Sequence, residues 1–110
     1  AGCVAISGSH GGISSARYAA AAGPLLSVFN DAGIGKDGAG IAGLARLRQL
    51  GLAACTVAHG SARIGDARST LDDGIISHVN AQAAALGVAV GQPCRQAAAQ
   101  AIENRNRRPP

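Results

Sequence analysis

Aromatic residues are nearly absent from this chain of 110 residues, which has one Tyr, one Phe and no Trp. It therefore offers no aromatic platform on which the bases of a nucleic acid could stack. Alanine supplies much of the 47% of residues that are hydrophobic, so the core buries little apolar area per residue. The free energy gained by burying this core therefore exceeds the entropy cost of ordering the chain by only a thin margin. A small parallel sheet also has two edges and two faces to cover, so we expect a homo-oligomer.

Long apolar runs and paired cysteines are missing too. No run approaches the length of a membrane span, so we expect no membrane partner. Cys3, Cys55 and Cys94 are odd in number and form no C-x-x-C pair, and no signal peptide is visible, which predicts reduced, buried thiols in a cytoplasmic protein. The chain contains no Met and enters its first predicted strand at once, so either its start is processed or residues precede Ala1.

Acidic residues are fewer than basic ones, and the net charge is +4. Much of the excess lies near the C-terminus, in Arg105, Arg107 and Arg108. We expect residues 103–110 to form a basic, disordered tail and residues 1–102 to form a single α/β domain. No RNA- or DNA-binding motif accompanies the charge, so we do not expect nucleic acid as a partner.

One pattern recurs along the chain: an Ala/Leu-rich helix, a glycine, and then an apolar strand. It occupies residues 17–29, 44–57 and 82–90, the last copy ending in a predicted strand over Val88–Val90. Glycine tolerates the left-handed conformation at a helix end, which marks these junctions. With a first strand near residues 3–7, the order βαβαβαβα predicts a small three-layer domain with a parallel sheet of about four strands and right-handed crossovers.

The predicted helices differ in clarity. The segment from Gly38 to Leu50 has apolar residues at helical spacing. The connection from His59 to Gly74 has weak periodicity, and a firmer helix is expected from near Ile75, with His78 inside it as a packing or surface residue. Long connections in compact domains are often lids or binding loops.

Polar residues cluster in three segments that each follow a predicted strand. These segments are residues 7–12, 30–37 and 59–63. In an open parallel sheet, the loops that leave the carboxyl ends of the strands gather along one edge, and ligands bind there. We therefore expect the three segments to form one composite site.

The segment from Gly33 to Gly38 reads G-x-G-x-x-G between a strand and a helix. Asp31 and Asp37 would repel a pyrophosphate, and His59 stands where an acidic residue should bind a ribose. We favour a glycine turn that permits close packing, or an anion site at the helix start, over a dinucleotide site. No organic cofactor is predicted.

Spacing excludes two further motifs. Lys36 is followed by Asp37 and not by Ser or Thr, which excludes a phosphate-binding Walker A loop. Neither Ser9 nor Ser61 stands in G-x-S-x-G, so a serine triad of the α/β-hydrolase type is not expected.

The candidate catalytic residues are His10, Asp31, His59 and Ser61. Histidine titrates near neutral pH, which suits general acid–base catalysis, and we assign that role to the two histidines. Asp31 orients one of them or acts as the base, and Ser61 is a hydrogen-bond donor or a nucleophile. His10, Asp31 and His59 are also candidates for a divalent metal site, and a helix-capping role for His10 is a further alternative.

The same segments carry groups that bind anions. Lys and Arg in glycine-rich loops hold carboxylates or phosphates, and turn amides add donors. Alternatively, the cations form solvated ion pairs, Lys36 with Asp37 and Arg63 with Asp66. The predicted substrate-binding residues are Ser9, Gly11, Gly12, Asn30, Gly33, Gly35, Lys36, Arg63 and Asp66.

These groups favour a small enzyme without an organic cofactor, with acid–base chemistry of the hydrolase or lyase type. Its substrate would be an anionic small molecule bound at the C-terminal edge of the parallel sheet. The alternative is a ligand-binding or partner-binding subunit of a larger assembly that uses the same crevice without turnover. Substitution of a catalytic histidine separates the two hypotheses, because only the enzyme loses turnover while it keeps its ligand affinity.

Overall fold

The computed structural model of the chain describes residues 4–12, 17, 19–21, 23–33, 38 and 41–107, with the backbone alone for 105–107. Residues 17 and 19–21 are helical and precede the second strand. The α/β class predicted from the sequence is confirmed. In chain order the elements are β1 (Val4–His10), β2 (Leu26–Asn30), α2 (Ala42–Gln49), β3 (Ala54–Val57), α3 (Ala67–Asp73), β4 (Ile76–Val79), α4 (Ala81–Ala85) and α5 (Cys94–Arg107).

The sheet has four strands in the order β1-β2-β3-β4. β1, β2 and β3 are parallel, and β4 runs antiparallel to β3. β2 and β3 are buried at every residue, as expected for central strands made of continuous apolar sequence. The sheet is therefore mixed and not parallel throughout, while the predicted handedness of its crossovers stays a prediction.

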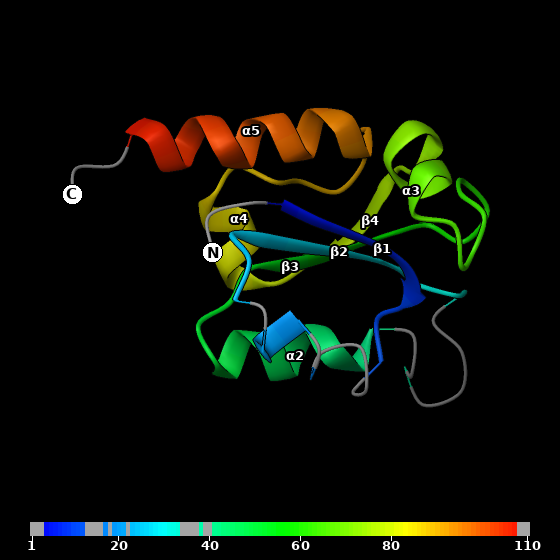
Figure 1. Cartoon of the computed structure of the whole chain (residues 1–110), viewed down its shortest axis with the longest axis horizontal. Coiled ribbons are helices and arrows are strands. Elements are labelled where there is room, and N and C mark those ends of the chain that lie inside the picture. The colour runs from blue at the N-terminus through cyan, green and yellow to red at the C-terminus, as the bar shows by residue number, and fades with distance from the viewer. Residues whose placement is uncertain are drawn as a thin grey trace.

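β4 corrects two expectations. We predicted a helix from near Ile75 and a last strand over Val88–Val90, but the strand is Ile76–Val79, and Val88 packs into the core from the connection between α4 and α5. α3 has 7 residues, which span only about 10 Å. It lies at the end of the sheet where the parallel strands finish (Figure 1). Because the chain never returns to the other end, it re-enters the sheet antiparallel.

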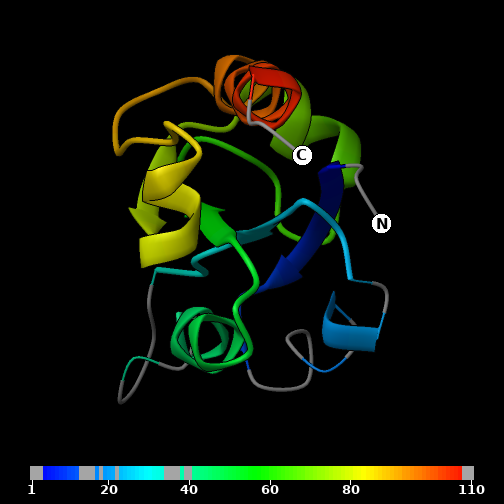
Figure 2. The same cartoon turned by 90° about the vertical axis from the view of Figure 1, so that its left-hand side faces the viewer.

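Helices lie on both sides of the sheet, with α3 and α5 on one side and α2 on the other (Figures 1 and 2). Leu26 and Val28 of β2 face the α5 side, and Phe29 faces α2. On the α5 side they pack with residues such as Val57, Ile76, Ala97 and Ala101. On the α2 side Phe29 packs with Ala19, Leu44, Leu47 and Ala54.

Two cysteines belong to the core. Cys55 and Cys94 are free and buried, and Cys3 lies outside the described residues. Burial raises the pKa of Cys55 well above its usual range and raises the pKa of Cys94 to about 11. Both groups are therefore neutral thiols that act as packing residues at physiological pH.

The segment expected to be a tail begins as helix, because α5 continues to Arg107. Its last three residues, 108–110, lie outside the described part of the chain. No helix in the described part is long and apolar enough to cross a membrane. The single domain, the cytoplasmic location and the homo-oligomer stay predictions.

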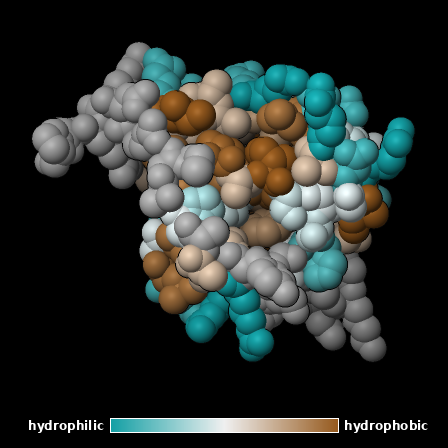
Figure 3. Space-filling model, in the orientation of Figure 1, coloured by the Kyte–Doolittle hydropathy of each residue, from teal (hydrophilic) through white to brown (hydrophobic). Residues whose placement is uncertain are grey.

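β1 forms one edge of the sheet and borders the face seen in Figure 3. Hydrophobic side chains gather in the middle of this face, with hydrophilic ones above them (Figure 3). Val4 and Ile6 of β1 are partly buried hydrophobic residues packed against the core. An edge strand with apolar neighbours is a surface that another chain can cover.

Candidate functional site

The connection between β3 and α3 doubles back across the sheet and rests on β1. The backbone amide of Gly65 donates to the carbonyl of Gly8 at 2.6 Å. A Cβ atom added to Gly8 would lie 2.2 Å from the nitrogen of Asp66, so only glycine fits at this position. Gly8 therefore positions the loop, a role that the sequence pattern alone did not reveal.

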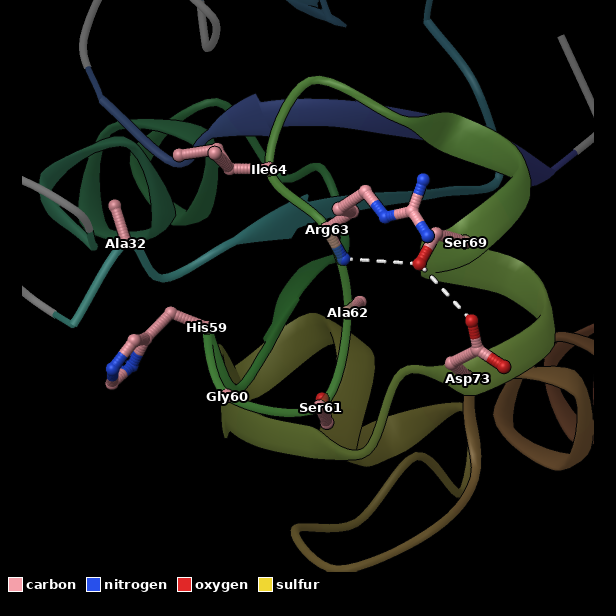
Figure 4. Close-up of a pocket in the computed structure, with 9 residues that line it drawn as sticks. All are labelled: Ala32, His59, Gly60, Ser61, Ala62, Arg63, Ile64, Ser69 and Asp73. Carbon is pink, nitrogen blue, oxygen red and sulfur yellow. Dashed lines mark hydrogen bonds between the residues drawn. The ribbon is translucent and has the colours of Figure 1, made fainter.

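A pocket of about 620 Å³ opens where this connection meets α3 (Figure 4). Residues 59–64 of the connection line it, which include the predicted site residues His59, Ser61 and Arg63. Ala32 lines it from the segment after β2. Ser69 and Asp73 line it from α3 and were not predicted, because the weak periodicity of residues 59–74 did not indicate a helix beside the loop.

Asp31 and His59 come together as the sequence predicted for neighbouring strand ends. Asp31 Oδ1 accepts the amide N–H groups of Gly33 at 2.9 Å and of His59 at 3.0 Å. His59 Nδ1 lies 3.6 Å from the same oxygen. The Asp31 side chain is 6% exposed and that of His59 is 66% exposed, so a buried carboxylate anchors an accessible imidazole.

The electrostatics of Asp31 reflect this arrangement. Burial raises the pKa of its carboxyl group. Hydrogen bonds from the Ser77 hydroxyl and from the amides of Gly33 and His59, together with the charge of His59, outweigh burial and hold the pKa below its ordinary value. Asp31 is therefore a carboxylate at neutral pH.

A second imidazole approaches Asp31 from the other side. His78 Nδ1 lies 3.9 Å from Asp31 Oδ2. The pairing of β3 with β4 shifts between Thr56 and Val57, which is a β-bulge. Ser77 and His78 both reach Thr56 there, with Thr56 Oγ1 at 2.9 Å from Ser77 Oγ and 3.4 Å from His78 Nδ1. His78 is thus a strand residue beside the site, which corrects its expected place in a helix.

Three predicted site residues have structural partners. Ser61 Oγ donates to the carbonyl of Ala58 at 2.7 Å and accepts the amide N–H of Ile75 at 3.0 Å. The proton of its hydroxyl is therefore already used in a hydrogen bond to the backbone. The buried Asn30 side chain accepts the amide N–H of Ala32 at 2.7 Å and donates to the carbonyl of Ala62 at 3.3 Å. Asp66 caps α3, with its side chain accepting the amide N–H of Ser69 at 3.0 Å.

Arg63 lies across the pocket from His59 (Figure 4). Its amide donates to Ser69 Oγ at 3.0 Å, and that hydroxyl donates to Asp73 Oδ2 at 3.1 Å. Within the described residues its guanidinium forms no ion pair, so the alternative pairing with Asp66 does not occur. The guanidinium is therefore available to an anion from solution.

The remaining predicted residues lie elsewhere. His10 is exposed at the end of β1, opposite Asn30, and neither it nor the exposed Ser9 lines the pocket; both belong to the strand and not to a loop. Gly11 donates to the carbonyl of Asn30 at 3.0 Å and accepts from Gly43 at 2.7 Å, which ties β1 to the start of α2. Gly12 is buried. Gly35, Lys36 and Asp37 lie outside the described residues.

The metal hypothesis rests on His10, Asp31 and His59. Asp31 and His59 are neighbours, as the hypothesis requires. In the described part of the chain, however, no group of three or more His, Cys, Asp or Glu residues could hold a metal ion. His10 therefore does not complete a set of ligands with the other two.

No family model, no curated protein and no solved structure matches the chain. The functional argument therefore depends on the chemistry of the pocket. One side offers an imidazole beside a carboxylate, a group that can take up and release a proton. The other side offers a guanidinium, which can bind a carboxylate or phosphate group.

Proposed function

We propose that the protein is a small enzyme that needs no organic cofactor and performs acid–base chemistry of the hydrolase or lyase type on an anionic small molecule. The observation that carries the proposal is the Asp31–His59 pair at the edge of an open pocket. A pocket of about 620 Å³ has the size that small-molecule sites commonly have.

His59 is the general acid–base in this proposal. Asp31 accepts the His59 backbone amide and so fixes the backbone that carries the imidazole, while its carboxylate lies 3.6 Å from ring Nδ1. A carboxylate beside Nδ1 favours the tautomer that carries its proton there and leaves Nε2 free to accept one from the substrate.

Arg63 is the anion-binding residue in this proposal. Its guanidinium is not neutralised by an acidic partner in the described residues, and it can hold a carboxylate or phosphate through two parallel hydrogen bonds. Because Ser61 is committed to Ala58 and Ile75, the proposal uses no serine nucleophile. The nucleophile of a hydrolase reaction would then be a water molecule that His59 deprotonates.

One observation favours the alternative, a ligand-binding or partner-binding subunit without turnover. In Figure 4 the imidazole of His59 points away from the guanidinium of Arg63. A single small substrate would have to span both groups, whereas a binding site makes no such demand. We also propose that the chain functions as a homo-oligomer through the β1 edge.

The two functions are separated by substitution. Turnover is measured on a panel of small carboxylate and phosphate esters and of hydroxy acids, and affinity is measured by calorimetry with the same compounds. We expect His59→Gln to lower kcat by about a hundredfold or more with affinity nearly unchanged, and Arg63→Gln to weaken binding. His10→Gln is the matched control, since His10 is exposed but does not line the pocket.

The opposite pattern would favour the binding subunit. If no compound in the panel is turned over, and if the His59 and Arg63 variants weaken binding equally, the enzymatic proposal is wrong. Equal loss of turnover in the His10 and His59 variants would also contradict it, because the pocket would then not contain the reacting group.

A further inference from the structure

A second pocket, of about 310 Å³, lies on the α2 side of the sheet. It is formed between α2 and the chain that runs from β4 into α4, and it shares no lining residue with the first pocket in the described part of the chain. Asn80 closes it by donating to the carbonyls of Leu44 at 3.2 Å and Leu52 at 2.9 Å. These hydrogen bonds hold the chain between β4 and α4 against α2 and the residues that follow it, and so fix the walls of the pocket.

His78 lines this pocket, and the contacts of its ring involve one nitrogen. Its Nδ1 faces inward, at 3.2 Å from Ser77 Oγ, 3.4 Å from Thr56 Oγ1 and 3.9 Å from Asp31 Oδ2. Nε2 has no hydrogen-bond or ion-pair partner among the described residues, and the side chain is 33% exposed. His78 lines the pocket, so Nε2 is the ring atom available to a ligand there.

Arg48 supplies a fixed positive charge. It is an exposed residue in the last turn of α2 and lines the pocket. Its carbonyl accepts from Gln82 Nε2 at 3.2 Å, which holds the end of α2 against α4. Within the described residues no carboxylate forms an ion pair with its guanidinium, so the charge is uncompensated.

The remainder of the lining is apolar apart from Asn80, and it contains no acidic residue among those described. An anion with an aliphatic part would fit such a pocket. Its charge would interact with the cationic groups, and its carbon chain would be buried from water against the apolar side chains. The apolar lining residues are Ile41, Leu44, Ala45, Val79 and Ala81.

We propose that this pocket binds a short-chain aliphatic carboxylate. Arg48 and Nε2 of His78 hold the carboxylate group, and the apolar residues of α2 and β4 receive the chain. The bond to Arg48 is charge-assisted, and the one to His78 needs a proton on Nε2. The site adjoins the first one through His78, whose Nδ1 lies 3.9 Å from Asp31 Oδ2, but the proposal does not depend on the reaction proposed for the first pocket.

Hexanoate is the probe, followed by amide chemical shifts in two-dimensional NMR spectra of the full chain. We expect saturable shifts at Ala45, Val79 and Ala81. Hexanol, which lacks the charge, and inorganic phosphate, which lacks the carbon chain, should each bind at least about tenfold more weakly. The dispersion of the same spectra reports whether each variant is folded.

Three variants complete the test. Arg48→Gln and His78→Gln should each raise the Kd for hexanoate by about tenfold or more. Arg46→Gln should change it less than about twofold, because Arg46 is exposed on the same helix without lining the pocket. The proposal is overturned by the absence of saturable shifts at the pocket, by phosphate binding as tightly as hexanoate, or by an unchanged Kd in both folded pocket variants.

Discussion

Gly8 and Gly65 are joined by a hydrogen bond of 2.6 Å from the amide of Gly65 to the carbonyl of Gly8. This contact fixes the connection after β3 against β1, which is separated from β3 by β2 in the sheet. The same connection carries His59 and Arg63 and lines the pocket. The shape of the candidate site therefore depends on a glycine that has no chemical role in it.

Replacement of Gly8 by alanine should destabilise the protein. The new Cβ would lie 2.2 Å from the nitrogen of Asp66 and 2.4 Å from the carbonyl carbon of Gly65, so backbone must shift. We expect a loss of about 2 kcal/mol in the free energy of unfolding, measured by urea denaturation. Gly60→Ala is the matched control, since nothing lies within 4 Å of a Cβ there, and it should cost less than about 0.5 kcal/mol. Equal losses would contradict the steric explanation.

Removal of the Asp31 carboxylate should destabilise the protein in a pH-dependent way. Asp31→Ala leaves the amides of Gly33 and His59 without their acceptor, which should cost about 1–3 kcal/mol near neutral pH. The pKa of Asp31 is lower in the folded chain than its ordinary value. Its charged form therefore stabilises the fold above the ordinary carboxyl pKa, and this contribution is lost as the pH falls through the folded pKa.

The measurement is urea unfolding of the wild-type chain and Asp31→Ala at several pH values from neutral to strongly acidic. The difference in unfolding free energy between them should be largest above the ordinary carboxyl pKa of 3.8 and should shrink below it. A difference that stays constant into strong acid would show that the carboxylate does not carry the stabilisation.

The sequence could predict that the residues following β2 and β3 would lie close together. Asp31 and His59 each follow an apolar central strand, and parallel neighbours bring such ends together whatever the exact register. His78 could not be placed in this way. Its strand has only 4 residues, too few to separate a strand from a helical turn by periodicity, and its approach to Asp31 depends on a bulge in the pairing.

The edge of the sheet at β1 provides the test of the homo-oligomer. Ile6 is partly buried against the core at this edge, where a second copy would cover it and its neighbours. Ile6→Lys should lower the mass of the particle measured by light scattering after size-exclusion chromatography, because a charge opposes strand-to-strand contact. Leu50→Lys is the control, since Leu50 is an exposed hydrophobic residue at the end of α2. A wild-type chain that runs as a monomer would contradict the expectation.

Asn80 joins three elements with one buried amide. Its Oδ1 accepts the amide N–H groups of Ala54 and Ala83, both at 3.0 Å, and its Nδ2 donates to the carbonyls of Leu44 and Leu52. All of its hydrogen-bonding capacity is thus used, on β3, on the start of α4 and around α2. Asn80→Ala leaves these backbone groups unpaired and should lower the free energy of unfolding by about 2–4 kcal/mol.

Asn80→Asp tests which half of the amide matters. The aspartate has nearly the same shape and keeps both acceptor bonds, but an ionised carboxylate turns an oxygen toward the carbonyls of Leu44 and Leu52. It should therefore be destabilising at neutral pH, and less so in mild acid, where a protonated carboxyl can donate to one of them. Unfolding by urea at both pH values measures the change. If Asn80→Asp is as stable as the wild-type chain at neutral pH, the donor half of the amide does not hold α2 to the sheet.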